Sequence, residues 1–151
     1  MNLLSLKKSR ITTIVICLLI ISSISVAFKL SHVDFTEPPI SEDTYAYILA
    51  AFSIINGDFS QPDTKPLGWS ILLSPFYLFD DSTDLLHYVN IARILSIAIS
   101  TITILPMYIL ARRFFDEKYS LVASCLFAFE PHLINNSTMG LSEPLFILAI
   151  I

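Results

Sequence analysis

Glycine and charge are both scarce in this chain of 151 residues. Its three Gly residues are few for a β-rich fold or for a loop that wraps a phosphate group. Only 15% of the residues are charged, whereas soluble domains usually have about 25%. The chain is 54% hydrophobic, with a mean hydropathy of +0.70, and its apolar residues form long blocks. These features indicate a membrane protein rather than a soluble domain.

Cysteine and clustered basic residues are also scarce. Cys17 and Cys125 both lie in apolar segments, so they suit buried positions and form neither a disulfide framework nor a metal motif. Residues 29–90 contain no Arg and only two Lys, Lys29 and Lys65. A basic face for nucleic acid is therefore absent, and we expect no nucleic-acid partner. The same segment holds most of the acids: Asp34, Glu37, Glu42, Asp43, Asp58, Asp63, Asp80, Asp81 and Asp84.

The first apolar block, residues 11–28, has no charged residue. As a helix it would span about 27 Å, close to the hydrocarbon thickness of a bilayer. Lys7, Lys8 and Arg10 precede it, so the positive-inside rule places the N-terminus in the cytoplasm. A cleaved signal peptide is the alternative, with 25–27 as the cleavage site. We favour an uncleaved anchor because the apolar run is longer than a usual signal core.

Three further blocks complete the predicted topology. Residues 89–111 end at the basic Arg112 and Arg113, and residues 119–134 return outward. The fourth block begins at 144 and reaches only Ile151, so the chain is expected to be a fragment or an interrupted reading frame. The predicted fold is an all-α, multi-pass bundle in the cell membrane, with three complete spans and the start of a fourth. Residues 1–151 would form the N-terminal part of one domain.

The predicted outer loop, residues 29–88, contains two helix patterns. Ser41 suits an N-cap, Glu42 and Asp43 favour a first helical turn, and apolar residues recur at helical spacing until Asn56-Gly57 closes the helix. This amphipathic helix is expected to lie along the membrane surface. A second apolar stretch, 67–79, is too short to span and predicts an interfacial or re-entrant helix.

Five residues are candidates for chemistry. A carboxylate at Asp43 or Glu42 could accept a proton from an acceptor group, although both acids also suit a helix N-terminus. Lys65 could hold a lipid phosphate, with Trp69 at the headgroup level, or could be a solvated lysine.

Arg93 and Glu143 each have a structural and a functional interpretation. Arg93 could snorkel to the interface, or it could pair with a loop acid or a phosphate. Glu143 could simply begin the fourth helix, or it could be a second outer acid close to Asp43.

Short motifs in a fixed order resemble the class C glycosyltransferase superfamily, in particular its prokaryotic branch related to protein O-mannosyltransferases and aminoarabinose transferases. The matching segments are 41–45 (Ser-Glu-Asp-Thr-Tyr), 65–69 (Lys-Pro-Leu-Gly-Trp), 91–96 (Ile-Ala-Arg-Ile-Leu-Ser), 112–115 (Arg-Arg-Phe-Phe) and 141–145 (Leu-Ser-Glu-Pro-Leu). The family's loop acid often follows a small residue, whereas Glu42 precedes Asp43 here.

The resemblance implies transfer of a sugar from a polyprenyl-phosphate donor to a protein, lipid or glycan acceptor on the outer face. Asp43 would be the base, with Glu42 in reserve, while Lys65, Arg93 and Glu143 would bind substrate or lipid phosphate. No carboxylate cluster has convincing metal spacing, so no cofactor is predicted and a divalent metal stays open. We expect the 151 residues alone to be insufficient for transfer. The alternative function is a non-catalytic membrane protein, such as a transporter or assembly subunit whose outer loop binds a partner.

Overall fold

The computed structural model describes residues 3–59, 66–80 and 82–151, and within them every regular element is a helix. The predicted all-α class is confirmed for this part of the chain. Its eight helical segments are α1 (Leu3–Ser31), α2 (Glu42–Ile55), α3 (Leu67–Leu78), α4 (Leu85–Ile102), α5 (Ile104–Ala111), α6 (Glu117–Ala128), α7 (Pro131–Met139) and α8 (Glu143–Ile150).

Two helices are long and apolar enough to cross a membrane. The first is the stretch Arg10–Ser31 of α1, with 22 residues, and the second is Leu85–Ala111, with 27 residues. The second consists of α4 and α5, because backbone bonds continue through Thr103: its N–H donates to Ile99 O and its carbonyl accepts from Met107 N, both at 3.0 Å. The boundary between α4 and α5, at Thr103, lies close in sequence to Pro106, which has no N–H to donate.

The third predicted span, residues 119–134, is not one helix. Helix α6 ends at Ala128, and α7 begins at Pro131. Proline suits the first position of a helix because its missing N–H would have no intrahelical partner there. The Glu130 carboxylate caps the new helix by accepting from Leu133 N at 2.7 Å. With 12 residues, α6 is about 18 Å long, shorter than the hydrocarbon layer of about 30 Å.

Both helices predicted in the outer loop are confirmed. Helix α2 begins at Glu42, directly after Ser41, and ends before Asn56 and Gly57, which has a φ of 75°. The Ser41 side chain makes no capping hydrogen bond, so the two first-turn acids are the remaining local signal for this start. Helix α3 covers nearly all of the apolar stretch predicted at 67–79. The loop itself is shorter than expected because α1 continues to Ser31 and α4 begins at Leu85.

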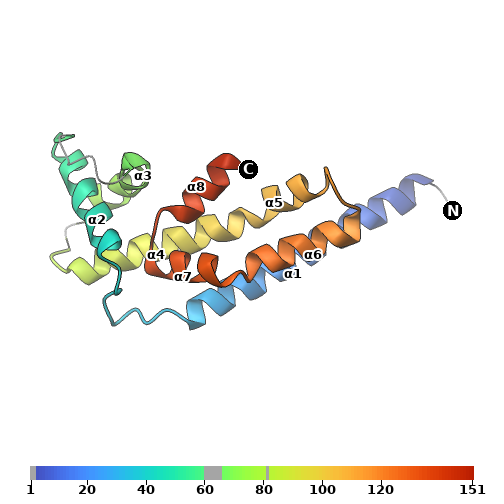
Figure 1. The fold of residues 1–151 in the computed structure, drawn as a ribbon, viewed down its shortest axis with the longest axis horizontal. Coiled ribbons are helices and arrows are strands. Elements are labelled where there is room, and N and C mark those ends of the chain that lie inside the picture. Colours follow the sequence, from blue (N-terminus) through green and yellow to red (C-terminus); the bar gives the residue numbers. More distant parts are fainter. Residues whose placement is uncertain (1–2, 60–65, 81) are drawn as a thin grey trace.

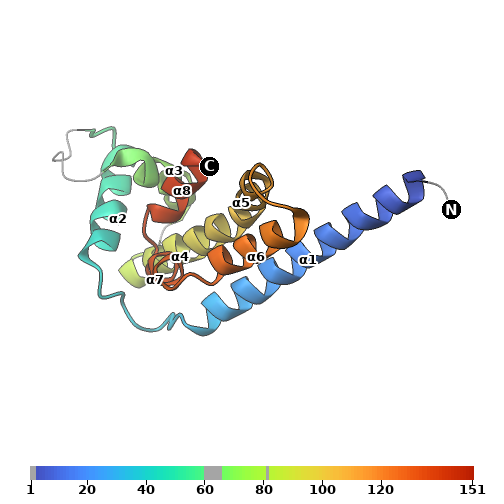
Figure 2. The same cartoon turned by 45° about the vertical axis from the view of Figure 1, so that its right-hand side comes forward.

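The helices form an elongated bundle with a cap at one end. Figures 1 and 2 show α1, α4–α5 and α6 running along the long axis, while α2 lies across one end of the bundle. The N-terminus and the turn between α5 and α6 lie at the opposite end in both views. Arg112 and Arg113 follow α5 directly, so the basic N-terminal end of α1 and this basic turn share one end of the molecule.

The bundle carries its large apolar side chains outside and small polar ones inside. Helix α1 exposes Ile16, Leu19 and Ile20, whereas its Ser25 is fully buried and donates to Ala128 O on α6 at 3.0 Å. Small residues at helix contacts and apolar residues outside are typical of helices packed in lipid. Among the residues whose burial is described, the buried serines and threonines are Ser25, Thr44, Ser70, Ser96, Ser100, Thr103, Ser120, Ser124 and Ser137.

Aromatic packing fixes the cap to the bundle. Tyr77 of α3 lies between Phe52 of α2 and Tyr88 of α4, with ring centroids 5.6 and 5.0 Å away. The Tyr77 hydroxyl donates to Tyr88 O at 3.0 Å. Burial of this ring raises the pKa of Tyr77 above its ordinary value, so the hydroxyl remains a donor at neutral pH. Helices α2 and α3 therefore hold a defined position on the end of α4.

Candidate functional site

The turn between α7 and α8, Met139–Ser142, is the meeting point of the cap and the bundle. Four side chains bind it. Thr44 of α2 donates to Met139 O at 2.8 Å, and Trp69 of α3 donates to Gly140 O at 3.0 Å. Ser96 of α4 donates to Leu141 O at 3.0 Å, and the hydroxyls of Tyr47 and Ser142 lie 2.8 Å apart. Three helices thus satisfy three consecutive carbonyls of one turn.

Gly140 brings this turn directly onto the backbone of α4. Its φ is 78°, a left-handed conformation that side chains disfavour. A Cβ added to Gly140 would meet Arg93 N at 3.1 Å, Ala92 C at 3.2 Å and Ala92 Cβ at 3.3 Å. The turn therefore needs glycine for its backbone conformation and for its close approach to α4.

A cavity of about 320 Å³ lies between α3 and α8, beside this turn. Most of its wall is apolar, and Glu143 at the start of α8 is among its lining residues. The Oε2 atom of Glu143 is buried and has no hydrogen-bond partner among the described residues. An unpartnered buried acceptor is unusual, and a water, an ion or a ligand can satisfy it. The cavity is lined by Pro66, Gly68, Trp69, Ser142, Glu143, Leu145, Phe146 and Ala149.

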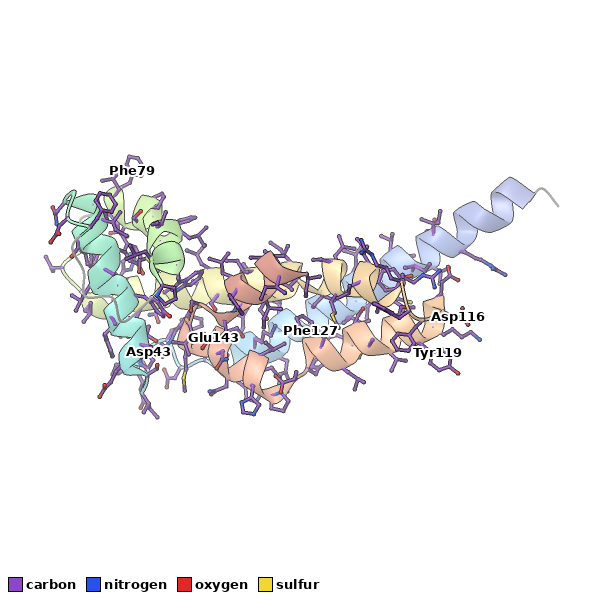
Figure 3. The ribbon with its side chains drawn as sticks, turned by 45° about the horizontal axis from the view of Figure 1, so that its top comes forward. Asp43, Phe79, Asp116, Tyr119, Phe127 and Glu143 are labelled. Atoms are coloured by element: carbon purple, nitrogen blue, oxygen red, sulfur yellow. The ribbon has the colours of Figure 1, made fainter. Side chains whose placement is uncertain are left out.

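The acids Glu42 and Asp43 lie at the start of α2. Glu42 is exposed and Asp43 is half-buried. Figure 3 shows Asp43 and Glu143 at the same end of the bundle, on α2 and α8. Because Thr44, the next residue after Asp43, binds the turn that leads to Glu143, both helix starts are attached to the same turn. The structure therefore brings the helices that carry these predicted acids together.

The side chain of Arg93 lies against the segment that joins α1 to α2. Its side chain is 6% exposed, and its Nη1 atom donates to Asp34 O, Glu37 O and Asn90 Oδ1, each at 3.0 Å. No carboxylate within the described ranges forms a salt bridge with it. Arg93 is also not among the residues that line the α3–α8 cavity.

Two further sequence expectations concern the start of α3. Lys65 lies outside the described residues, and Pro66, which follows it, lines the cavity. Trp69, predicted at the headgroup level, is 1% exposed, and its indole N–H donates to Gly140 O. Its depth in the membrane stays a prediction. Across the part of the chain that is described, no three His, Cys, Asp or Glu side chains gather to hold a metal ion.

Sequence reasoning missed the residues that bind the turn. Thr44 and Tyr47 share one face of α2, but nothing in the sequence connects them with residues 139–142, 95 positions away. Ser96 is one of several small polar residues in an apolar helix, and its sequence position gives no sign of this contact.

Comparison with protein-family models, with curated proteins and with solved structures gave no match for this chain.

Replacing Gly140 by Ala should destabilise the cap strongly. The added Cβ is strained by the positive φ and crowds the α4 backbone, so we expect a loss of about 2 kcal/mol or more in the free energy of unfolding. Gly57→Ala is the matched control, because its φ is 75° but no atom lies within 4 Å of the new Cβ. The control should lose about 1 kcal/mol. Denaturant unfolding in detergent, followed by the emission of the single Trp69, measures both; equal losses would contradict the close approach.

Replacing Thr44 by Val should loosen the turn without changing the side-chain volume. The change leaves Met139 O without its donor in a buried place, so we expect unfolding to become easier by about 1–3 kcal/mol. Thr101→Val is the control, because the Thr101 hydroxyl donates only to Ile97 O within its own helix. The same fluorescence assay compares the variants, and a Thr44→Val protein as stable as the control would rule out this contact.

Proposed function

We propose that this chain forms the outer-face site of a membrane glycosyltransferase that takes sugar from a polyprenyl-phosphate donor. The observation that carries the proposal is the α3–α8 cavity, whose wall is mainly apolar and includes Glu143, with the buried Oε2 atom of this residue unpaired among the described residues. A long apolar chain joined to a polar, hydroxyl-rich head has the chemistry to occupy both parts. The order of motifs that resembles the class C glycosyltransferases supports the same function.

The proposed membrane placement is multi-pass. Helix α1 would cross outward, α4–α5 would cross back, and α6 with α7 would return. Three observations support this placement: the two long apolar helices, the small-residue contacts between α1 and α6, and the basic residues gathered at one end. The cap formed by α2 and α3 would then lie on the non-cytoplasmic side, with α2 across the bundle axis, along the membrane surface.

The start of α3 suits the phosphate of the donor. The first amides of a helix have no intrahelical acceptor and carry a partial positive charge, which favours a bound anion. The N-cap residue Pro66 gives α3 no side-chain hydrogen bond, and among the described residues no atom lies within 4 Å of the position of a Cβ on Gly68. Lys65, two residues before α3, would add a full positive charge. Leu145, Phe146 and Ala149 of α8 would contact the isoprenoid chain.

The acids would act on the acceptor and the sugar. In the proposed reaction an acceptor oxygen forms a bond to the anomeric carbon of the sugar. The bond from that carbon to the phosphate oxygen breaks, and its electron pair leaves with the polyprenyl phosphate. The acceptor proton moves to a carboxylate, for which Asp43 is the first candidate and Glu42 the second. Because a carboxylate repels a phosphate, Glu143 suits sugar or acceptor hydroxyls rather than the phosphate itself.

The topology can be tested with single cysteines in a variant that lacks Cys17 and Cys125. We expect a membrane-impermeant thiol reagent, applied from outside, to label Thr36→Cys in the loop between α1 and α2. It should not label Arg113→Cys after α5 until the membrane is permeabilised. Both positions are exposed in the structure, so access to the thiol depends on the side of the membrane. Labelling of Arg113→Cys in intact cells would contradict the proposed placement.

The reaction can be tested in membranes that contain the whole reading frame, supplied with radiolabelled polyprenyl-phosphate sugars. Asp43→Asn should lower sugar transfer by about 100-fold or more, as expected on loss of a general base. Glu143→Gln should weaken transfer. Trp69 emission should still respond to added polyprenyl phosphate, because Gln has nearly the same shape as Glu and leaves the cavity wall unchanged. Asp116→Asn, at the opposite end of the bundle, is the matched control and should transfer normally. Unchanged transfer in Asp43→Asn would remove Asp43 from the mechanism.

A further inference from the structure

We infer that Arg93 is a positioning residue, which sets the start of α2 and hence the place of Asp43 relative to Glu143. The inference concerns the connector, residues 32–41, which joins α1 to α2. Its structural part stands without the proposed function. Its consequence for sugar transfer rests on that function.

Arg93 and Asn90 together hold the connector against α4. The Arg93 Nη1 atom donates to Asp34 O and Glu37 O, and Asn90 Nδ2 donates to Phe35 O at 2.9 Å. Asn90 Oδ1 also accepts from the same Arg93 Nη1 atom, so the two side chains orient each other. Three backbone carbonyls of a segment without helix or strand are thus bound by one turn of α4.

The connector beyond Glu37 is stiff, so its attachment reaches α2. Pro38 and Pro39 each have a fixed φ, and a residue before proline is restricted to extended conformations. Only Ile40 and Ser41 separate these prolines from Glu42, the first residue of α2. Fixing the Glu37 carbonyl therefore limits where α2 begins. A connector of glycine and serine would not transmit the constraint in this way.

The same residue of α4 also touches the turn that carries Glu143. The backbone N of Arg93 lies 3.1 Å from the position of a Cβ on Gly140. The side chain of Arg93 therefore binds the connector that leads to Asp43, and its backbone contacts the turn that leads to Glu143. Arg93 is a shared reference point for the helix starts that carry the two acids.

The guanidinium binds the connector through one nitrogen. Its Nη1 atom is used by two carbonyls and an amide oxygen, and Arg93 is 6% exposed. Its buried Nε atom has no partner among the described residues, and Arg93 also lines a separate pocket of about 220 Å³ beside the connector. The nearby Asp34 carboxylate does not need Arg93 as its main partner, because hydrogen bonds from Thr36 are the largest cause of its lowered pKa. Because all three bonds come from one nitrogen, a lysine ammonium, which has three donors on a shorter side chain, would replace them in part.

Distances between spin labels test the inference in the whole chain, reconstituted in bilayer nanodiscs with Cys17 and Cys125 replaced. The first pair of labels, at Ile40 and Ile150, measures the distance from the start of α2 to α8. The second pair, at Leu49 and Ile71, measures the distance from α2 to α3. All four positions are exposed. Arg93→Gln should broaden the first distance distribution about two-fold and leave the second unchanged. Arg93→Lys should have an intermediate effect, and Arg113→Gln, at an exposed arginine after α5, should have none.

Two results would overturn the inference. One is an unchanged distribution for the first pair in Arg93→Gln. The other is equal broadening of both pairs, which would mean that Arg93 supports the fold in general rather than the start of α2.

Transfer kinetics separate this inference from the proposed function. With the reading frame intact, Arg93→Gln should lower kcat by about 10- to 100-fold, as misplacement of a reacting group does, with little change in KM for the donor. A raised KM with unchanged distances would assign Arg93 to the phosphate and overturn the positioning role. If the wild type transfers no sugar, the proposed function fails, while the label distances still decide whether Arg93 positions α2.

Discussion

The contact between Gly140 and the backbone of α4 is the constraint on which the rest of this structure depends. The close approach places three consecutive carbonyls, those of residues 139–141, within reach of side chains from α2, α3 and α4. Those hydrogen bonds in turn connect the cap to the bundle, and Leu141 of the turn belongs to the same hydrophobic cluster as Tyr77 and Tyr88. Polar and aromatic contacts together prevent α2 and α3 from pivoting on α4. The cavity between α3 and α8 exists because both of its walls are fixed in this way.

The distribution of polar atoms explains how a chain with so few charges keeps a defined packing. A protein folded in water would bury its large apolar residues, but α1 exposes them and buries Ser25 and Lys29. Lys29 is 1% exposed, and its Nζ atom donates to Ser100 Oγ at 2.7 Å. In an apolar surrounding, hydrogen bonds between helices give direction that dispersion contacts lack, and small side chains allow the helices to approach closely. The same helices would be poorly specified by Leu and Ile alone.

The sequence was informative wherever a local rule decides the structure. The two first-turn acids and Asn56-Gly57 located α2 to the residue, because helix ends depend on neighbouring residues. The apolar run suggested one span from 119 to 134, but Pro131 begins a new helix within it, because proline suits the first position of a helix. The bonds of Thr44, Trp69 and Ser96 to the turn could not be foreseen, because they join residues 45 to 95 positions apart. For the same reason the sequence left snorkelling, a loop acid or a phosphate open for Arg93, whereas its partners are two carbonyls of the connector and the Asn90 side chain.

The contrast within residues 139–143 bears on the proposed function. Each carbonyl from Met139 to Leu141 receives a donor from another helix, although a turn at a helix end could leave them to water. Glu143, two residues later, has a buried oxygen with no donor among the described residues. Leaving a buried polar group unpaired costs about 1–3 kcal/mol, and the described residues leave two such side-chain atoms, Glu143 Oε2 and Arg93 Nε. A group that stays unpaired until a ligand arrives binds that ligand more strongly, because the ligand relieves this cost. Under the proposed function, this property makes Glu143, rather than the exposed Glu42, the acid better suited to a hydroxyl-bearing substrate at the cavity.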